Sequence, residues 1–183
     1  MTNTTTPKIY VASLSDYNAG ILHGAWIYCG EGLQTYEIQE DIEKQVLATS
    51  PTAECEGRPA EEWVIHDYEG FGSYKVEEYD DLEDVAGVAN IITAEGNGEL
   101  MIDFWQEIGC DIDEIESKFD EAFLGEYDDL ESYAESYLEE TGMLSSLPEN
   151  LKYYFDFEKY AYDLSFEILT LDTENGVAVF SNC

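Results

Sequence analysis

The chain has 183 residues, of which 44% are hydrophobic and 14% aromatic, so it can build packed cores and lacks the composition of a disordered protein. Its 42 acidic and 7 basic side chains give a net charge of −35, whereas a small soluble domain is comfortable with a magnitude of about 2–8. A field of this sign repels nucleic acid and anionic membranes, so we expect neither as a partner. The expected partners are cations or a strongly basic protein surface.

The N-terminal part has the pattern of a small sheet with one helix. Turn residues fill 16–20, DYNAG, and the apolar spacing over 34–48 predicts an amphipathic helix that ends before Ser50. Three segments rich in β-branched and aromatic residues predict strands: 8–14 (KIYVASL), 21–29 (ILHGAWIYC, with a break at Gly24) and 62–68 (EWVIHDY).

The middle of the chain has helical periodicity. Two apolar runs between residues 77 and 109 predict two helices separated by glycines. The following stretch, 111–142, carries thirteen carboxylates and one cation, Lys118, yet its apolar residues keep helical spacing. We expect two further helices there, divided near Gly125, that form a folded acidic surface.

The C-terminal part predicts a second small α+β unit. Pro148 suits the first turn of a helix, and 166–171 and 177–180 are predicted strands joined by a hairpin that contains Asn175-Gly176. The expected fold class is therefore α+β, with small antiparallel sheets at both ends and a helical middle.

The sequence gives little support to catalysis or to a cofactor. His23 and His66 are the two histidines, and each is better explained as a structural residue. A glycosidase carboxylate pair carries no weight in so acidic a chain, and the calcium loop that begins at Asp111 lacks the glycine and glutamate of an EF-hand. We expect no enzyme activity, no cofactor and no metal site.

The cysteine pattern and the N-terminal sequence indicate the cellular compartment. Cys29, Cys55, Cys110 and Cys183 are scattered without a CxxC pair, which predicts reduced thiols. The N-terminus MTNTTTPK lacks the features of a signal peptide, and no run approaches the roughly 18 apolar residues of a membrane span. A cytoplasmic location is expected.

The acidity has three open interpretations. Halophilic solvation would spread carboxylates evenly, but residues 1–70 hold 12 acids and 3 bases while 71–183 hold 30 and 4. A binding module for a basic protein, such as a nucleoid protein or another nuclease, also fits. The third interpretation is imitation of DNA: one duplex charge per about 1.7 Å of axis makes 35 charges equivalent to roughly 60 Å of duplex.

Residues 8–27, KIYVASLSDYNAGILHGAWI, resemble the N-terminal signature of the ArdA antirestriction proteins of mobile elements. Three more stretches fit in order along the chain: 65–69 (IHDYE), 137–142 (YLEETG) and 147–164 (LPENLKYYFDFEKYAYDL).

The resemblance implies a homodimeric DNA mimic that occupies the DNA-binding groove of the methyltransferase core of type I restriction-modification enzymes. Such a mimic blocks restriction and sometimes methylation. It implies an elongated chain of three small domains: 1–80, an α+β domain; 81–122, a helical middle; and 123–183, an α+β domain through which subunits pair. It also places the antirestriction motif within 142–158.

Two sets of residues follow as candidates. The dimer contact is expected at Leu144, Leu147, Leu151 and Tyr154. The carboxylates expected to replace phosphates are Asp80, Asp81, Glu83, Asp84, Asp111, Asp113, Glu116, Asp120, Glu126, Asp128, Asp129, Glu131, Glu135 and Glu139.

Overall fold

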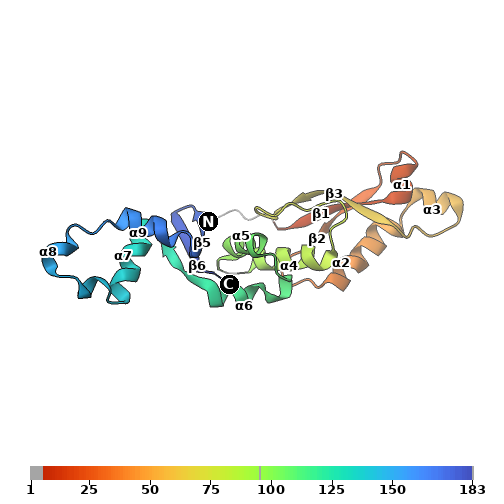
Figure 1. Ribbon diagram of the computed structural model, residues 1–183. Coiled ribbons are helices and arrows are strands. Elements are labelled where there is room, and N and C mark those ends of the chain that lie inside the picture. The colour runs from red at the N-terminus through yellow and green to blue at the C-terminus, as the bar shows by residue number, and fades with distance from the viewer. Residues whose placement is uncertain (1–5, 95, 183) are drawn as a thin grey trace. The chain divides into compact units, whose positions relative to one another are not determined.

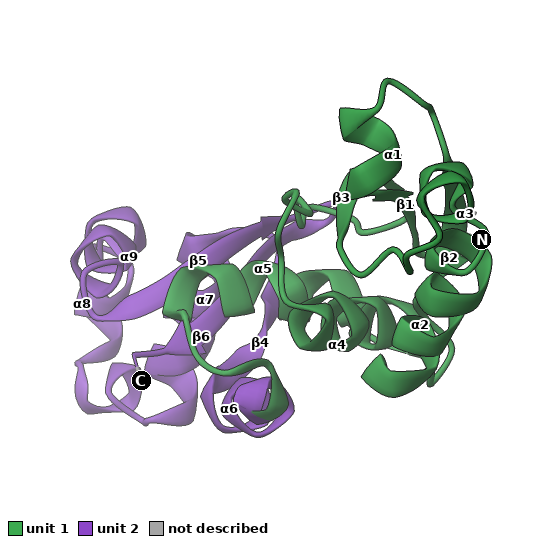
Figure 2. Ribbon diagram, turned by 90° about the vertical axis from the view of Figure 1, so that its right-hand side faces the viewer, with its two compact units in different colours: residues 1–113 green, residues 114–183 purple. Residues whose placement is uncertain are grey.

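The computed structural model describes residues 6–94 and 96–182, and the chain folds into two compact units, residues 1–113 and 114–183 (Figure 2). Each unit contains a three-stranded antiparallel sheet and several helices. The predicted α+β class with two small antiparallel sheets is confirmed. The division into three domains stays a prediction.

The sheet of unit 1 has the order β2-β1-β3, built from β1 (Lys8–Ser13), β2 (Gly24–Tyr28) and β3 (Trp63–Glu69). All three predicted strands are present, although β2 begins only at Gly24. A Cβ atom at Gly24 would lie 2.4 Å from the carbonyl oxygen of Val11 on β1, so this close pairing requires glycine. The expected break is therefore the first residue of the strand.

Helices α2 (Thr35–Ile42) and η1 (Glu43–Leu47) form the predicted amphipathic helix, whose last turn is π-helical. They pack against β1 and β2, and bury Ile38, Ile42 and Val46.

Two short helices were missed by the sequence patterns. The predicted turn at 16–20 is largely helix α1 (Leu14–Asn18), and α3 (Pro51–Glu56) starts where the previous helix was expected to end. In both, a serine caps the first turn: Ser13 Oγ accepts from the amide of Asp16, and Ser50 Oγ from that of Ala53. The two helices pack together at one end of the sheet (Figure 1).

The predicted helical pair of the middle is present as α4 (Leu82–Thr93) and α5 (Gly98–Ile108). These helices pack against each other, and α4 also packs against α2. Helix α4 buries six apolar residues, which makes it the central helix of unit 1: Leu82, Val85, Ala86, Val88, Ala89 and Ile92.

The acidic stretch contains a strand that the sequence did not predict. After η2 (Ile112–Glu114), helix α6 (Ile115–Ala122) runs directly into β4 (Phe123–Tyr127), and α7 (Leu130–Glu140) follows. Phe123 continues the helical spacing of the apolar residues before it, but it pairs with Phe180 of the sheet. Tertiary pairing thus overrides the local helical pattern.

The rest of unit 2 starts with η3 (Leu144–Ser146), α8 (Glu149–Lys152) and α9 (Phe157–Leu164). The helix expected from Pro148 is therefore a single turn followed by a separate helix. The predicted hairpin is confirmed as β5 (Ile168–Thr173) and β6 (Gly176–Ser181).

The sheet of unit 2 has the order β4-β6-β5, with β6 central. Gly176 begins β6 with φ +150°, and a Cβ atom there would lie 2.1 Å from the carbonyl oxygen of Tyr127. Only glycine fits at this point. Helices α7 and α9 pack together, and the core that they share with β6 comprises Tyr133, Ala134, Ala161, Leu164 and Val179.

Candidate protein-binding surface

Most of the fourteen candidate carboxylates are exposed on folded elements. Asp80 and Asp84 are half-buried. The exposed ones are Asp81, Glu83, Asp111, Asp113, Glu116, Asp120, Glu126, Asp128, Asp129, Glu131, Glu135 and Glu139. The candidates therefore belong to an ordered surface, as the periodicity of the sequence predicts.

Five of the candidates in unit 1 surround one hollow of about 400 Å³, which we call the acidic hollow. It lies where the first turn of α4 meets the segment after α5. Its other lining residues are Trp105, Cys110 and Ile112, and its carboxylates are Asp81, Glu83, Asp84, Asp111 and Asp113.

Asp84 has the least favourable environment of this group. Partial burial raises the pKa of its carboxyl group, and the neighbouring carboxylates Asp81, Asp80 and Asp111 raise it further. The carboxylates thus repel one another, and the fold holds them together nonetheless.

Two unit 1 candidates also stabilise local structure. Asp80 accepts hydrogen bonds from the hydroxyl group of Tyr74 at 2.8 Å and from the amide of Glu77 at 2.9 Å. Asp81 is the N-cap of α4 and accepts from the amide of Glu83 at 2.9 Å. Each is bound through one carboxylate oxygen in these contacts, so each has a structural role in addition to its charge.

In unit 2 the candidates are distributed over consecutive elements. Glu116 and Asp120 lie on α6 and Glu126 on β4, while Asp128 and Asp129 connect β4 to α7. They present charge along the surface of the chain.

Helix α7 carries a line of like charges. Glu131, Glu135 and Glu139 are exposed and follow one another at i, i+4 and i+8. Asp129 caps the helix, because its Oδ1 accepts from the amide of Ser132 at 2.8 Å and from its hydroxyl group at 2.7 Å. These hydrogen bonds hold the pKa of Asp129 below its ordinary value.

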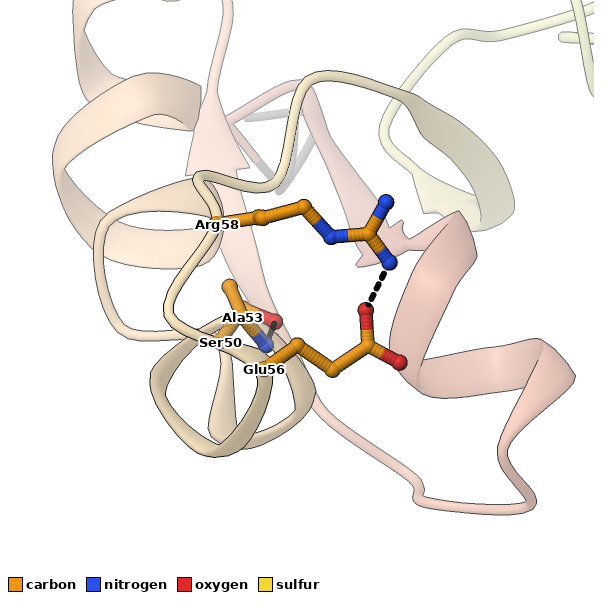
Figure 3. A network of polar contacts seen from close by, with 4 residues as sticks. All are labelled: Ser50, Ala53, Glu56 and Arg58. Carbon is orange, nitrogen blue, oxygen red and sulfur yellow. Dashed lines mark hydrogen bonds and ion pairs between the residues drawn. The ribbon is translucent and has the colours of Figure 1, made fainter.

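Among the residues that the structure describes, five Lys and Arg side chains form ion pairs with carboxylates. Arg58 pairs with Glu56 at 2.6 Å beside the serine cap of α3 (Figure 3). The other four pairs are Lys8–Glu69, Lys44–Glu40, Lys118–Glu114 and Lys152–Glu149. None of the acids in these pairs is among the candidates.

The candidate dimer residues lie in a segment with exposed apolar side chains. Leu144 and Leu147 are half-buried, whereas Leu151 is 49% and Tyr154 is 78% exposed. Tyr153 is 88% exposed, and its ring contacts that of Tyr154. This apolar surface is too exposed for a core, which favours a partner there.

A second hollow in unit 1 was missed by sequence reasoning. It measures about 780 Å³ and lies between the start of α2, β3 and the segment before α4. We call it the aromatic groove, after three rings that line it, those of Tyr36, Trp63 and Tyr79. Three acidic residues, Glu78, Asp80 and Asp81, line it as well. Tyr36 lies on α2, and its side chain is 65% exposed.

Within residues 6–94 and 96–182, no group of three or more His, Cys, Asp or Glu side chains is arranged to hold a metal ion. Every helix described there is too short or too polar to cross a membrane. Cys29, Cys55 and Cys110 are free thiols, and Cys183 lies outside the described residues.

The fold and the surface together define an acidic α+β protein that presents ordered carboxylates. The family model of the antirestriction protein ArdA matches residues 9–179, nearly the whole chain. The chain therefore belongs to the ArdA antirestriction protein family, as the sequence segments had indicated. A comparison with curated protein sequences finds no match.

Proposed function

We propose that this chain inhibits type I restriction-modification enzymes by binding the DNA-binding groove of their methyltransferase core as a homodimeric DNA mimic. Its surface carboxylates take the place of DNA phosphates, and restriction is blocked without any catalytic step. Membership of the antirestriction family supports this proposal. The observation that carries it is the exposure of twelve of the fourteen candidate carboxylates on ordered elements.

The charge spacing on α7 is of the same order as that of one DNA strand. Glu131, Glu135 and Glu139 follow one another at i, i+4 and i+8 along this helix. A rise of about 1.5 Å per residue places them roughly 6 Å apart, against about 3.4 Å per phosphate along one strand. A basic groove that binds a phosphate backbone therefore meets a regular line of charge on this helix, at about half the linear density of a DNA strand.

The acidic surface opposes the stability of the elements that carry it. Like charges at i and i+4 cost a helix a few tenths of a kcal/mol per pair. In the acidic hollow, partial burial raises the pKa of Asp84, and repulsion by neighbouring carboxylates raises it further. A surface with these costs is more readily explained by binding than by packing.

The exposed apolar segment of unit 2 supports the homodimer. Leu151, Tyr153 and Tyr154 would be withdrawn from water if a second copy covered them. A dimer also doubles the charged length available to a groove that accepts long duplexes.

A competition titration tests the proposal. The chain is titrated into a purified type I methyltransferase core at several salt concentrations, with and without a duplex that contains the recognition site. We expect binding that weakens steeply with salt and is displaced by the duplex. Binding that is independent of salt and of the duplex would contradict the mimicry.

Two controls separate the alternatives. Circular dichroism at the same salt concentrations reports whether the chain stays folded, because a halophilic surface would lose structure at low salt. A nucleoid protein serves as a second basic partner. Tighter binding to that protein than to the methyltransferase core would favour the general binding module over the restriction inhibitor.

A further inference from the structure

The aromatic groove combines aromatic rings with carboxylates, and both kinds of group attract cations. Tyr36 and Tyr79 are 65% and 73% exposed, and Trp63 is half-buried beside them. Glu78, Asp80 and Asp81 line the same hollow. Aromatic rings attract a cation over their faces, and carboxylates attract it by charge.

The electrostatics of the groove exclude an anionic ligand. No Lys or Arg is among the residues that line it. The two helix N-termini at its rim already have acidic partners: Asp81 accepts from the amide of Glu83 on α4, and Glu37 accepts from the amide of Gln34 at the start of α2. These carboxylates offset the partial positive charge of the helix ends.

Tyr79 responds to this negative field. The charge of Glu78 is the main cause that raises the pKa of the Tyr79 hydroxyl group, followed by desolvation. The phenol therefore stays neutral at physiological pH. An apolar ligand would bury the carboxylates without compensating them, so a cationic group with a planar, apolar face fits best.

The same unit contains an internal example of this recognition. Lys8 lies over the ring of Trp26 with its Nζ atom 4.6 Å from the ring centroid, and it also pairs with Glu69 at 2.9 Å. There the chain's own lysine contacts both an aromatic ring and a carboxylate. In the aromatic groove, Trp63 also lies among carboxylates, but the other residues that line the groove are aromatic, acidic or neutral.

We infer that the aromatic groove binds an arginine side chain presented by the basic protein partner. A guanidinium group stacks on aromatic rings and donates two parallel hydrogen bonds to a carboxylate, which a lysine ammonium group does not. The identity of that partner rests on the proposed function. The stacked bases of duplex DNA do not expose their ring faces to an arginine side chain. The groove would therefore make a contact that DNA does not make, in addition to the contacts in which carboxylates replace phosphates.

A peptide titration tests the groove by itself. The probe is acetyl-Gly-Arg-Gly-amide, and the control is the same peptide with citrulline, which keeps the shape and removes the charge. The chain has three tryptophans, so the indole N–H signals report separately. We expect the arginine peptide to shift the Trp63 signal and to leave the signal of Trp26, whose ring already has Lys8 over it, nearly unchanged. Equal shifts with both peptides would overturn the inference.

A variant series then tests the groove in the complex. The double variant Tyr36→Ala/Tyr79→Ala removes two exposed rings, and Tyr28→Ala removes a 57% exposed ring of the same unit outside the groove. We expect the double variant to bind the methyltransferase core roughly tenfold more weakly, with an unchanged salt dependence. The Tyr28→Ala control should bind like the wild type.

The outcomes distinguish the two proposals. If the wild type binds and is displaced by duplex DNA while the double variant binds equally well, the groove inference is wrong and the proposed function stands. If the wild type does not bind the methyltransferase core at all, the proposed function is wrong. In that case the peptide titration still decides whether the groove recognises arginine.

Discussion

The two units arrange their acidic residues differently, and unit 2 carries them at a higher density. Residues 1–113 contain 24 acidic and 4 basic residues, and residues 114–183 contain 18 and 3. In unit 1, carboxylates gather around hollows: one is mainly acidic, and the other is lined by rings. In unit 2 they follow α6, β4 and α7, and the two most exposed rings, Tyr153 and Tyr154, lie in the separate segment 143–154.

This difference indicates a division of roles. A line of charges on regular elements suits a partner that recognises charge spacing alone, as a phosphate-binding groove does. Hollows that are lined by carboxylates and have a defined shape can bind individual basic side chains of the partner. We therefore expect salt to dominate the contacts of α7, and packing to contribute more at the aromatic groove.

The largest expected effect is the loss of the unit 2 sheet in Gly176→Ala. The added Cβ atom would collide with the Tyr127 carbonyl oxygen, and we expect destabilisation of about 3 kcal/mol. As the temperature is raised, amide NMR should show a loss of chemical-shift dispersion for residues of β4, β5 and β6 at a lower temperature than for residues of unit 1. The control Gly142→Ala has φ +72° and open space around it, so it should cost only about 1 kcal/mol. Equal effects would show that the close approach is unimportant.

The next effect concerns the dimer contact in unit 2. Leu151→Asp/Tyr154→Asp places charges on the exposed apolar segment, so we expect sedimentation to change from dimer to monomer while the circular dichroism is kept. The matched control is Leu22→Asp in unit 1, where the side chain is 90% exposed. A double variant that remains dimeric would exclude this segment as the contact.

Charge removal on α7 should have opposite effects on stability and binding. In Glu131→Gln/Glu135→Gln/Glu139→Gln, loss of the like-charge repulsion stabilises the helix slightly. Binding to the methyltransferase core should weaken about tenfold and depend less on salt.

The control for this triple variant carries the same charge change on three exposed acids of unit 1 outside the candidate set: Glu31→Gln, Glu54→Gln and Glu61→Gln. We expect it to bind more nearly like the wild type. If both triple variants lose affinity equally, the position of the charges is irrelevant and only the net charge matters.

The smallest effects are changes of stability with pH, and they should differ in sign between the units. The raised pKa of Asp84 means that the folded state binds its proton more tightly, so stability falls as pH rises above the ordinary value of 3.8. The lowered pKa of Asp129 means that its stabilisation is present at neutral pH and is lost in acid.

Thermal unfolding of two variants measures these signs. Asp84→Asn should raise the midpoint at neutral pH, and Asp129→Ala should lower it because the cap of α7 is lost. The Asp84→Asn difference should shrink as the pH falls towards 3.8, whereas the ionisation-dependent part of the Asp129→Ala difference should persist to that pH and shrink only below it. A lower midpoint for Asp84→Asn would show that Asp84 is held by favourable contacts.

The sequence predicted the elements whose local pattern and tertiary environment agree. The β5–β6 hairpin was predictable because its two strands flank Asn175-Gly176, and α4 because its apolar residues repeat regularly. Strand β4 was not, because Phe123 fits the helical spacing that precedes it and becomes a strand residue only through pairing with Phe180. Helix α3 was missed because Ser50 was interpreted as the end of one helix and not as the cap of the next.

The site was predictable to a similar degree. Solvent exposure of the carboxylates on α7 follows from the helical periodicity. The aromatic groove does not, because Tyr36, Trp63 and Tyr79 come from three separate segments and only the fold brings them together. The structural roles of Asp81 and Asp129 as helix caps were also missed, although an acidic residue directly before a helix is a recognisable signal.

The central claim is that ordered carboxylates occupy the place of DNA phosphates on the enzyme. Hydrogen exchange of a type I methyltransferase core tests it most directly, with three samples compared: the free enzyme, the enzyme with cognate duplex, and the enzyme with this chain. The account predicts that this chain protects the same groove-lining peptides that the duplex protects. Protection confined to peptides outside the DNA-binding groove would contradict it.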